Sequence, residues 1–542
     1  MVVFLCYLCE NAYLCGRFQA IKNMSGRVQK SIKNIKVGIF FYLLSLFLAF
    51  FSRQVFLKYL GAEFVGLTGM LMNIMSFLSV AELGIGTSII YFLYKPLQED
   101  NHEKINEIMS MLAFLYRCIG MVIGIGGLTV SLFFPWWFGD LDTSLFLVYF
   151  AFYSFLASSM MGYIFNYRQL LVSANQKQYV VNGYFQTIAL VQSLTQIILA
   201  YCYQNLYLWV VVGLVFTIIG CIVFNRRIDK EYPWLHIDLK QGRKNLKRYP
   251  EVLRKTRQIF VQKMKDFILY RSDELLVGTF VSVVKVASYG CYTMITFKLI
   301  YLVNILSDGL SAGVGNLLAE GNEKNTMKVF WEMTAARFFI LGVIIFSLLM
   351  YLQHFVGFWV GPQHQMEMIV VYLLIFNLFI YLQNAAVYIF IGASGLFGDV
   401  WAAWTEFAIN ITVTLLLAPH YGIVGILLGK ITSVFFINVF WKPYYLFSKG
   451  FHKSVWVFWR GMAPYYLIFA SFVALSLLLN KLVITPYATS LPMLVVCGII
   501  TAVPMLILYF LMLFVSTKGM RYFVARKPAI YRLVSRLTFI KE

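Results

Sequence analysis

The sequence predicts an all-α polytopic membrane protein with about 14 transmembrane helices, in two homologous six-helix lobes plus a C-terminal helix pair. Of the 542 residues, 60% are hydrophobic and only 13% are charged, whereas an average soluble chain is roughly 25% charged. A soluble core cannot bury this much apolar surface, so the composition excludes a soluble enzyme, a secreted domain and a disordered chain. Long apolar runs and an internal repeat give the number of helices and their grouping.

Fourteen apolar runs are each long enough to cross a bilayer, which takes about 20 residues. They cover residues 37–60, 65–92, 108–134, 144–167, 179–203, 206–225, 264–284, 287–317, 329–353, 367–391, 400–417, 422–447, 463–483 and 491–516. We therefore predict the following order of parts: an N-terminal tail (1–36), an N-lobe (37–225), a basic linker (226–262), a C-lobe (263–447), helices 13 and 14 (463–516) and a basic tail (517–542). Met24 offers an alternative translational start, which would make residues 1–23 an artefact of the assigned start.

The basic residues are unevenly distributed between the two sets of loops. The chain has 45 Lys and Arg against 24 Asp and Glu, a net charge of +21. With the N-terminus inside, 35 of the basic residues lie in inner segments and four in outer loops. The positive-inside rule then places both termini in the cytoplasm. Since topology explains the basic excess, we expect no nucleic-acid partner.

Short sequence features recur in the two predicted lobes. Arg53 precedes Gly61 by eight residues on the first span, and Arg271 precedes Gly278 by seven on the seventh. A second set recurs at an offset of 220, namely Glu103-Lys104 and Arg117 with Glu323-Lys324 and Arg337. Six spans per half make the two repeats parallel, an arrangement found in alternating-access transporters.

Several charges lie deep in the predicted spans, where each costs about 2.5–3.5 kcal/mol on insertion scales. Such charges predict a hydrated cavity. Its basic residues are Arg53, Arg271, Lys298 and Lys430, and its acids, with a predicted role in ion coupling or gating, are Glu82, Asp273 and Asp308.

Other interpretations apply to some of the charged residues. Arg117 and Arg337 lie early in their helices, which favours side chains that extend toward the headgroups. Arg271 and Glu274, three residues apart, could instead neutralise each other. Lys430 follows Gly425 and Gly429, whose spacing permits close helix approach.

The sequence predicts no catalytic residues, no metal site and no cofactor other than a coupling H⁺ or Na⁺. Gly429-Lys430-Ile431-Thr432 resembles a phosphate-binding loop, but the glycine spacing is one residue short and the segment lies in an apolar span. The cysteines Cys6, Cys9 and Cys15 lack the fourth ligand of a zinc site. We therefore expect a protein that is not an enzyme.

Several motifs resemble bacterial polysaccharide flippases of the multidrug/oligosaccharidyl-lipid/polysaccharide exporter superfamily. Those in the N-lobe are 58–67 (KYLGAEFVGL), 81–86 (AELGIG) and 94–97 (YKPL), and those in the C-lobe are 311–316 (SAGVGN), 358–361 (FWVG) and 421–425 (YGIVG). The resemblance extends over residues 37–447.

The resemblance implies a transporter that moves polyprenyl-diphosphate-linked oligosaccharide, such as an O-antigen unit, from the inner to the outer leaflet of the bacterial cytoplasmic membrane for surface polysaccharide biosynthesis. Family members bind the diphosphate with cavity arginines, a role that Arg53 and Arg271 fit, with Lys298 and Lys430 as additional charges. The resemblance also implies a groove for the lipid tail at helices 13 and 14, and association with polysaccharide assembly enzymes.

Two alternatives remain open. A drug or cation antiporter of the same superfamily would need an acidic, aromatic cavity, whereas the basic residues favour an anionic substrate. A membrane enzyme that polymerises polysaccharide, or an acyltransferase, would need catalytic residues on a sizeable loop or an intramembrane histidine. The predicted outer loops are too short for a catalytic domain, and the predicted spans contain no histidine.

Overall fold

The backbone is helical along nearly its entire described length. This computed structural model describes residues 26–82, 85–139, 141–175, 177–250, 252, 256, 273–319, 321–396, 398–526, 531, 534 and 535, and no β-strand occurs among them. The chain forms two compact units, and the boundary between them falls inside one helix, between Gly290 and Cys291. We call the described residues up to Gly290 the N-unit and those from Cys291 onward the C-unit.

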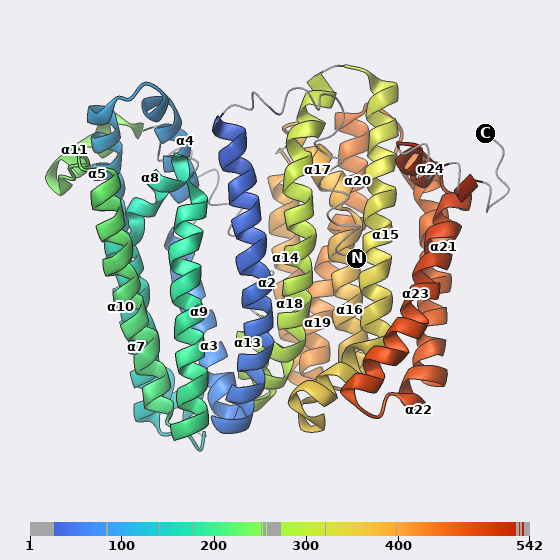
Figure 1. Cartoon of the computed structure of the whole chain (residues 1–542), viewed down its shortest axis with the longest axis horizontal. Helices are drawn as coiled ribbons and strands as arrows, with labels where there is room; N and C mark the ends of the chain where they lie inside the picture. The colour runs from blue at the N-terminus through green and yellow to red at the C-terminus, as the bar shows by residue number, and fades with distance from the viewer. Residues whose placement is uncertain are drawn as a thin grey trace. The chain divides into compact units, whose positions relative to one another are not determined.

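The described part of the N-unit is built from helices and short helical turns. Its elements are α2 (Gly26–Tyr59), α3 (Ala62–Leu78), η2 (Ser79–Glu82), α4 (Ile85–Gln98), α5 (His102–Ser131), α6 (Phe134–Phe138), α7 (Leu145–Phe165), η3 (Asn166–Arg168), α8 (Gln169–Ala174), α9 (Gln178–Tyr203), α10 (Leu206–Glu231), α11 (Leu239–Arg248), α13 (Asp273–Phe280) and the beginning of α14 (Val283–Ala319). Within it, α9 packs against α2 and α10, and α7 packs against α5 and α10 (Figure 1).

The C-unit continues α14 and adds the remaining helices. They are α15 (Glu323–Val360), η4 (Pro362–His364), α16 (Met368–Gln383), α17 (Ala385–Ala393), α18 (Val400–Tyr421), α19 (Ile423–Phe435), η5 (Phe436–Trp441), α20 (Lys442–Tyr445), η6 (Leu446–Gly450), α21 (Trp456–Leu479), η7 (Asn480–Ile484), α22 (Thr485–Tyr487), α23 (Leu491–Ser516) and α24 (Lys518–Ala525). The C-terminal helices α21 and α23 pack against each other and against α15 (Figure 1).

Twelve helices in the described part of the chain are long and apolar enough to cross a membrane. They correspond to twelve of the fourteen predicted spans. The predicted span 65–92 is divided into α3, η2 and α4, because the helix changes to a 3₁₀ turn at Ser79–Glu82. The predicted span 264–284 includes residues 264–272, which lie outside the described part. The observed fold is the predicted all-α polytopic membrane protein.

The repeat found in the sequence has a local structural counterpart at the start of α5 and of α15. A residue with positive φ precedes each helix, Asp100 (φ 47°) in one case and Gly321 (φ 68°) in the other. An asparagine then caps each helix, because the side chain of Asn101 accepts from the Lys104 amide, and that of Asn322 from the Asn325 amide. The same turn therefore begins both helices.

Glycines allow very close helix contacts at α18 and α19. A Cβ at Gly425 would lie 2.5 Å from the Leu417 carbonyl oxygen, and one at Gly429 would lie 2.2 Å from Thr414 Oγ1. No larger residue fits without moving the backbone of the neighbouring helix. The close approach predicted from the spacing of these two glycines is confirmed.

Candidate functional site in the N-unit

A polar cluster within the N-unit is centred on Arg53 of α2. Its Nη2 donates to the Ala287 carbonyl oxygen on α14 at 2.5 Å. Its Nε is buried and has no hydrogen-bond partner among the described residues. A guanidinium has five N–H donors in a fixed planar arrangement. Arg53 therefore keeps donor capacity that the described protein groups do not use.

The glycine at position 290 makes room for this guanidinium. A Cβ there would lie 2.6 Å from Arg53 Nη2 and 3.7 Å from Glu274 Oε1. The arginine and the carboxylate thus border the same small space beside α14. Any larger side chain at 290 would displace the guanidinium.

Two neighbouring acids on α13 complete the cluster. Asn73 of α3 donates from Nδ2 to Glu274 Oε2 at 2.7 Å. Asp273 is 8% exposed, and its Oδ2 accepts from the hydroxyl of Tyr289 at 3.1 Å. The cluster therefore combines one guanidinium with two carboxylates, each of which has a neutral hydrogen-bond donor.

Close packing of α3 holds these groups in position. A Cβ at Gly66 would lie 2.0 Å from the Val283 carbonyl oxygen at the start of α14. A Cβ at Gly278 of α13 would lie 2.2 Å from Met70 Sδ on α3. The backbones of α3, α13 and α14 approach this closely only because both positions are glycine.

Glu82 lies apart from this cluster, at the end of η2 where the second predicted span is interrupted. Its Oε1 accepts from the hydroxyl of Tyr116 on α5 at 2.6 Å. The ring of Tyr163 on α7 lies edge-on to Tyr116, with 5.8 Å between centroids. Glu82 is therefore held at the helix break by a tyrosine from a different span.

The C-unit contains a different set of deep charges. Lys430 of α19 is 3% exposed and Glu406 of α18 is 2% exposed. Lys298 of α14 is half-buried. Arg337 of α15 is buried and donates from Nη1 to the Val303 carbonyl oxygen at 3.1 Å. Each of these groups lies inside the fold.

The burial of Arg337 contradicts the prediction that its side chain extends to the headgroups. The helix pair α21 and α23 covers α15, and the hydroxyl of Tyr509 on α23 donates to the carbonyl of the adjacent Phe338 at 3.0 Å. Arg117, its counterpart in the N-unit, is exposed. In the C-unit α15 packs against α21, α23 and α24, whereas in the N-unit α5 packs against α4, α7 and α11 among the described helices.

The predicted site residues are thus distributed over several places. The structure brings Arg53 and Asp273 into one cluster, and places Glu82 at a separate contact in the same unit. Lys298 and Lys430 belong to the C-unit. Arg271 lies outside the described residues, and Asp308 belongs to α14 but its side chain is not among those described.

Sequence reasoning missed the neutral partners of the acids: Asn73, Tyr116 and Tyr289. Asn73 is the one predictable case, since an amide in an apolar span needs a polar partner. The two tyrosines gave no comparable signal, because a chain with 35 tyrosines contains many in apolar runs.

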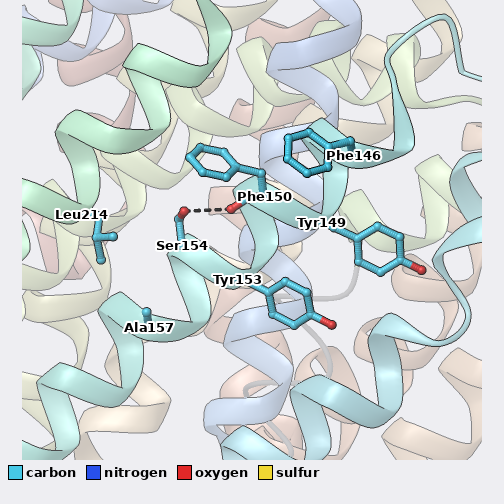
Figure 2. A pocket seen from close by; sticks show the side chains of 7 residues that line it. All are labelled: Phe146, Tyr149, Phe150, Tyr153, Ser154, Ala157 and Leu214. Carbon is cyan, nitrogen blue, oxygen red and sulfur yellow. Dashed lines mark hydrogen bonds between the residues drawn. The ribbon is translucent and has the colours of Figure 1, made fainter.

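Two cavities found in the N-unit do not include the residues of the Arg53 cluster. A pocket of about 440 Å³ lies between α7 and α10 and is lined by Phe146, Tyr149, Phe150, Tyr153, Ser154, Ala157 and Leu214 (Figure 2). Its one aliphatic hydroxyl, Ser154, donates to the carbonyl of Phe150 on its own helix at 2.7 Å. The pocket has no charged lining and suits an apolar group.

Comparison with known proteins identifies the fold. The sequence matches no protein-family model, and no curated protein matches it significantly. A solved structure described as the inward-facing conformation of a multidrug resistance MATE family transporter of the MOP superfamily is similar, with a TM-score of 0.54 and 14% identity over 73% of this chain and 93% of that one. A mutant of the Vibrio cholerae MATE transporter VcmN has a TM-score of 0.47 and 14% identity, over 78% of this chain and 97% of the other.

The chain is therefore a polytopic helical membrane protein with the fold of MATE transporters. At 14% identity the first similarity shows the fold alone.

Proposed function

We propose that this protein is a flippase that moves polyprenyl-diphosphate-linked oligosaccharide across the bacterial cytoplasmic membrane by alternating access, with both termini in the cytoplasm. The observation that carries the proposal is the guanidinium of Arg53, which lies deep in a predicted span with a buried Nε that no described residue satisfies. An arginine in this position is costly, and a diphosphate would accept charge-assisted hydrogen bonds from it.

The deep basic residues of the C-unit support an anionic substrate. Lys298, Arg337 and Lys430 are buried or half-buried, and each reduces the cost of moving a phosphate group away from water. The apolar tail of the substrate can remain in lipid while the headgroup crosses. An inside-negative membrane potential favours outward movement of negative charge. For two negative charges it supplies roughly 4.6 kcal/mol per 100 mV, so the potential can drive this transport without ATP.

The acids of the N-unit are the proposed coupling or gating groups. Asp273 and Glu274 each accept a hydrogen bond from a neutral group, and such an arrangement tolerates exchange between a proton and a cation at the carboxylate. Asp308 of α14 belongs to the same proposal on sequence grounds.

The same acids favour a second candidate, a cation antiporter of the superfamily. Asp273 and Glu274 place two carboxylates in the Arg53 cluster, and carboxylates are the groups that bind a cationic substrate. The solved structure with the higher TM-score is described as a multidrug resistance transporter. The two candidates differ in the sign of the substrate's charge.

One experiment separates the two candidates. Purified protein in proteoliposomes is supplied with a fluorescent polyprenyl-diphosphate sugar, and in a parallel assay with a fluorescent organic cation. We expect flipping of the diphosphate lipid, reduced about 10- to 100-fold by Arg53→Ala, since a hydrogen bond to a charged group contributes about 1.5–3 kcal/mol. Arg53→Lys should restore it only partly, because the planar fork is lost.

Lys58→Ala is the matched control, because Lys58 is an exposed cation on the same helix. It should transport the lipid like the wild type. Equal transport by Arg53→Ala and the wild type would contradict the proposal. Transport of the organic cation without transport of the diphosphate lipid would establish the antiporter instead.

A further inference from the structure

Each unit contains a short basic helix that packs against the helix beginning with the repeated asparagine cap. In the N-unit this is α11, which packs on α5, and in the C-unit it is α24, which packs on α15. Both helices are too short to span a bilayer. Each begins with a side-chain cap: the Asp238 carboxylate accepts from the Lys240 amide, and the Thr517 hydroxyl accepts from the Met520 amide.

A glycine makes the central contact in both cases. A Cβ at Gly242 of α11 would lie 2.2 Å from the Ser110 carbonyl oxygen. A Cβ at Gly519 of α24 would lie 2.2 Å from the Trp331 carbonyl oxygen. Counted from the two capping residues, Asn101 and Asn322, Ser110 and Trp331 are both nine residues further along, so the two contacts occupy equivalent places on α5 and α15.

An arginine at the end of each helix then binds an acid on the same partner helix. Arg248 Nη1 lies 2.7 Å from Glu107 Oε1, and Arg526 donates from Nε to Glu332 Oε2 at 2.9 Å. The acids are largely buried, with side chains 13% and 4% exposed. The glycine contact and the ion pair together attach each short helix to its partner, although Glu107 precedes Ser110 by three residues and Glu332 follows Trp331 by one.

In the N-unit, further contacts fix the segment that leads into α11. The ring of Trp234 stacks on His102 at 3.8 Å, and its carbonyl accepts from Asn106 Nδ2 at 3.3 Å. Asn245 donates to the Glu107 carbonyl at 3.2 Å. Part of the predicted linker 226–262 is therefore an ordered element of the N-unit.

The face of α11 that points away from α5 is basic. The helix sequence LKQGRKNLKR contains no acid. Lys240, Arg243 and Lys244 are exposed and make no ion pair with a described residue. Arg226 and Lys230, near the end of α10, are also exposed. In the C-unit, α24 adds Lys518, which is exposed, and Arg521.

We propose that α11 and α24 are equivalent helices that bind the phosphate headgroups of anionic phospholipids at the membrane surface. The charge of their outer faces is complementary to such headgroups, and each Lys or Arg near an anionic surface strengthens binding about fivefold. Because α11 packs on α5 and α24 packs on α15, headgroup binding would hold α5 and α15 at the membrane surface. This binding is independent of the transported substrate.

The test compares lipid preference in three variants of the full chain. Native mass spectrometry of the detergent-solubilised protein measures bound phosphatidylglycerol relative to phosphatidylcholine from an equimolar mixture. For Lys240→Gln/Arg243→Gln/Lys244→Gln we expect the preference for phosphatidylglycerol to fall at least about tenfold. The melting temperature should stay unchanged, since the three side chains are exposed.

The matched control is Lys58→Gln/Lys285→Gln/Lys481→Gln, which removes three exposed charges from the predicted outer loops. It should keep the preference of the wild type. In the third variant, Gly242→Val, all charges remain but the contact with Ser110 is lost, and the preference should fall because α11 is no longer held. An unchanged preference in the α11 triple variant, or an equal loss in the control, would overturn the proposal.

Discussion

The two units differ in the charges that lie deep in their spans. Among the described residues that are buried or half-buried within the predicted spans, the N-unit has one cation, Arg53, and three acids, Glu82, Asp273 and Glu274. The C-unit has four cations, Lys298, Arg337, Lys430 and Lys442, and two acids, Glu332 and Glu406. Charges of one sign in low dielectric repel one another and are costly to keep. The opposite balances indicate different tasks for two units that share a repeat.

The difference does not extend to the frame that carries these charges. The asparagine caps before α5 and α15, and the glycine contacts of α11 and α24, are alike in the two units. The two units therefore share these helix ends and attachments and differ in the charged residues inside their spans. Under the proposed function, the basic residues of the C-unit act on the anionic headgroup together with Arg53, and the acids of the N-unit act on the coupling ion.

The largest expected effect comes from removing a deep cation of the C-unit. Lys430→Met keeps the length of an unbranched side chain but removes its charge. We expect transport of a diphosphate lipid to fall about 10- to 100-fold, from the loss of a charge-assisted contact, with the change mainly in apparent substrate affinity. Initial flipping rates at several lipid concentrations in proteoliposomes measure it.

Lys449→Met is the control for this prediction, because Lys449 is exposed near the end of the same span. It should leave the rates unchanged. If Lys430→Met transports normally, the buried cations of the C-unit have a structural role. The difference in charge between the two units would then not indicate a difference in function.

A second prediction concerns the acids of the N-unit. Asp273→Asn keeps the shape of the side chain and its ability to accept from Tyr289, but removes the charge. We expect substrate affinity to stay near that of the wild type and the response to an imposed ion gradient to be lost. Flipping rates in proteoliposomes with and without a pH or Na⁺ gradient, at fixed membrane potential, measure the two effects separately. A variant that still responds to the gradient would exclude Asp273 as the coupling group.

The sequence predicted the spans well and the contacts between them poorly. Length and apolarity locate twelve of the fourteen spans, because a bilayer imposes both properties on a helix. Arg53 and Asp273 each have a hydrogen-bond partner in the structure, while the hydrated cavity inferred from their charge stays a prediction. The hydrogen-bond partner of each depends on which helices are neighbours, and no local pattern specifies that. Arg337 illustrates the limit, since its guanidinium donates to the Val303 carbonyl oxygen of α14, a contact that the local sequence does not specify.

Short amphipathic helices were also not predicted from the sequence. Residues 239–248 read as part of a basic linker, because ten polar-rich residues cannot span a membrane. Their helix is stabilised by the Asp238 cap and by the contact of Gly242 with a carbonyl of α5. The cap was visible in the sequence, whereas the contact was not.

A third prediction tests whether close packing is as important in the C-unit as the charges. Gly429→Ala would place a Cβ 2.2 Å from Thr414 Oγ1 and 2.9 Å from the Thr414 amide nitrogen. Overpacking of this kind destabilises by about 1–3 kcal/mol, so we expect a lower melting temperature in detergent. Gly392→Ala on α17 is the matched control, since a Cβ there meets no atom within 4 Å. Equal melting temperatures for the two variants would show that α18 and α19 separate without cost.

The smallest expected effect concerns Glu82, the acid of the N-unit that lies outside the Arg53 cluster. Its hydrogen bond from Tyr116 joins the helix break at η2 to α5. Double-mutant cycles inside membrane proteins give coupling energies of roughly 0.6–1.7 kcal/mol for such pairs. We expect a value in that range from the unfolding free energies of Glu82→Gln, Tyr116→Phe and the double variant. A parallel cycle of Glu82→Gln with Tyr149→Phe should give no coupling, because Tyr149 lines the apolar pocket instead. Suppose that a coupling energy appears only in the Tyr116 cycle and that Glu82→Gln leaves gradient-driven transport unaffected. Glu82 then stabilises the helix break. Among the described residues of the N-unit, only the α13 acids would remain candidates for binding the coupling ion. Loss of gradient response in Glu82→Gln would instead extend the acidic function of the N-unit to a second place.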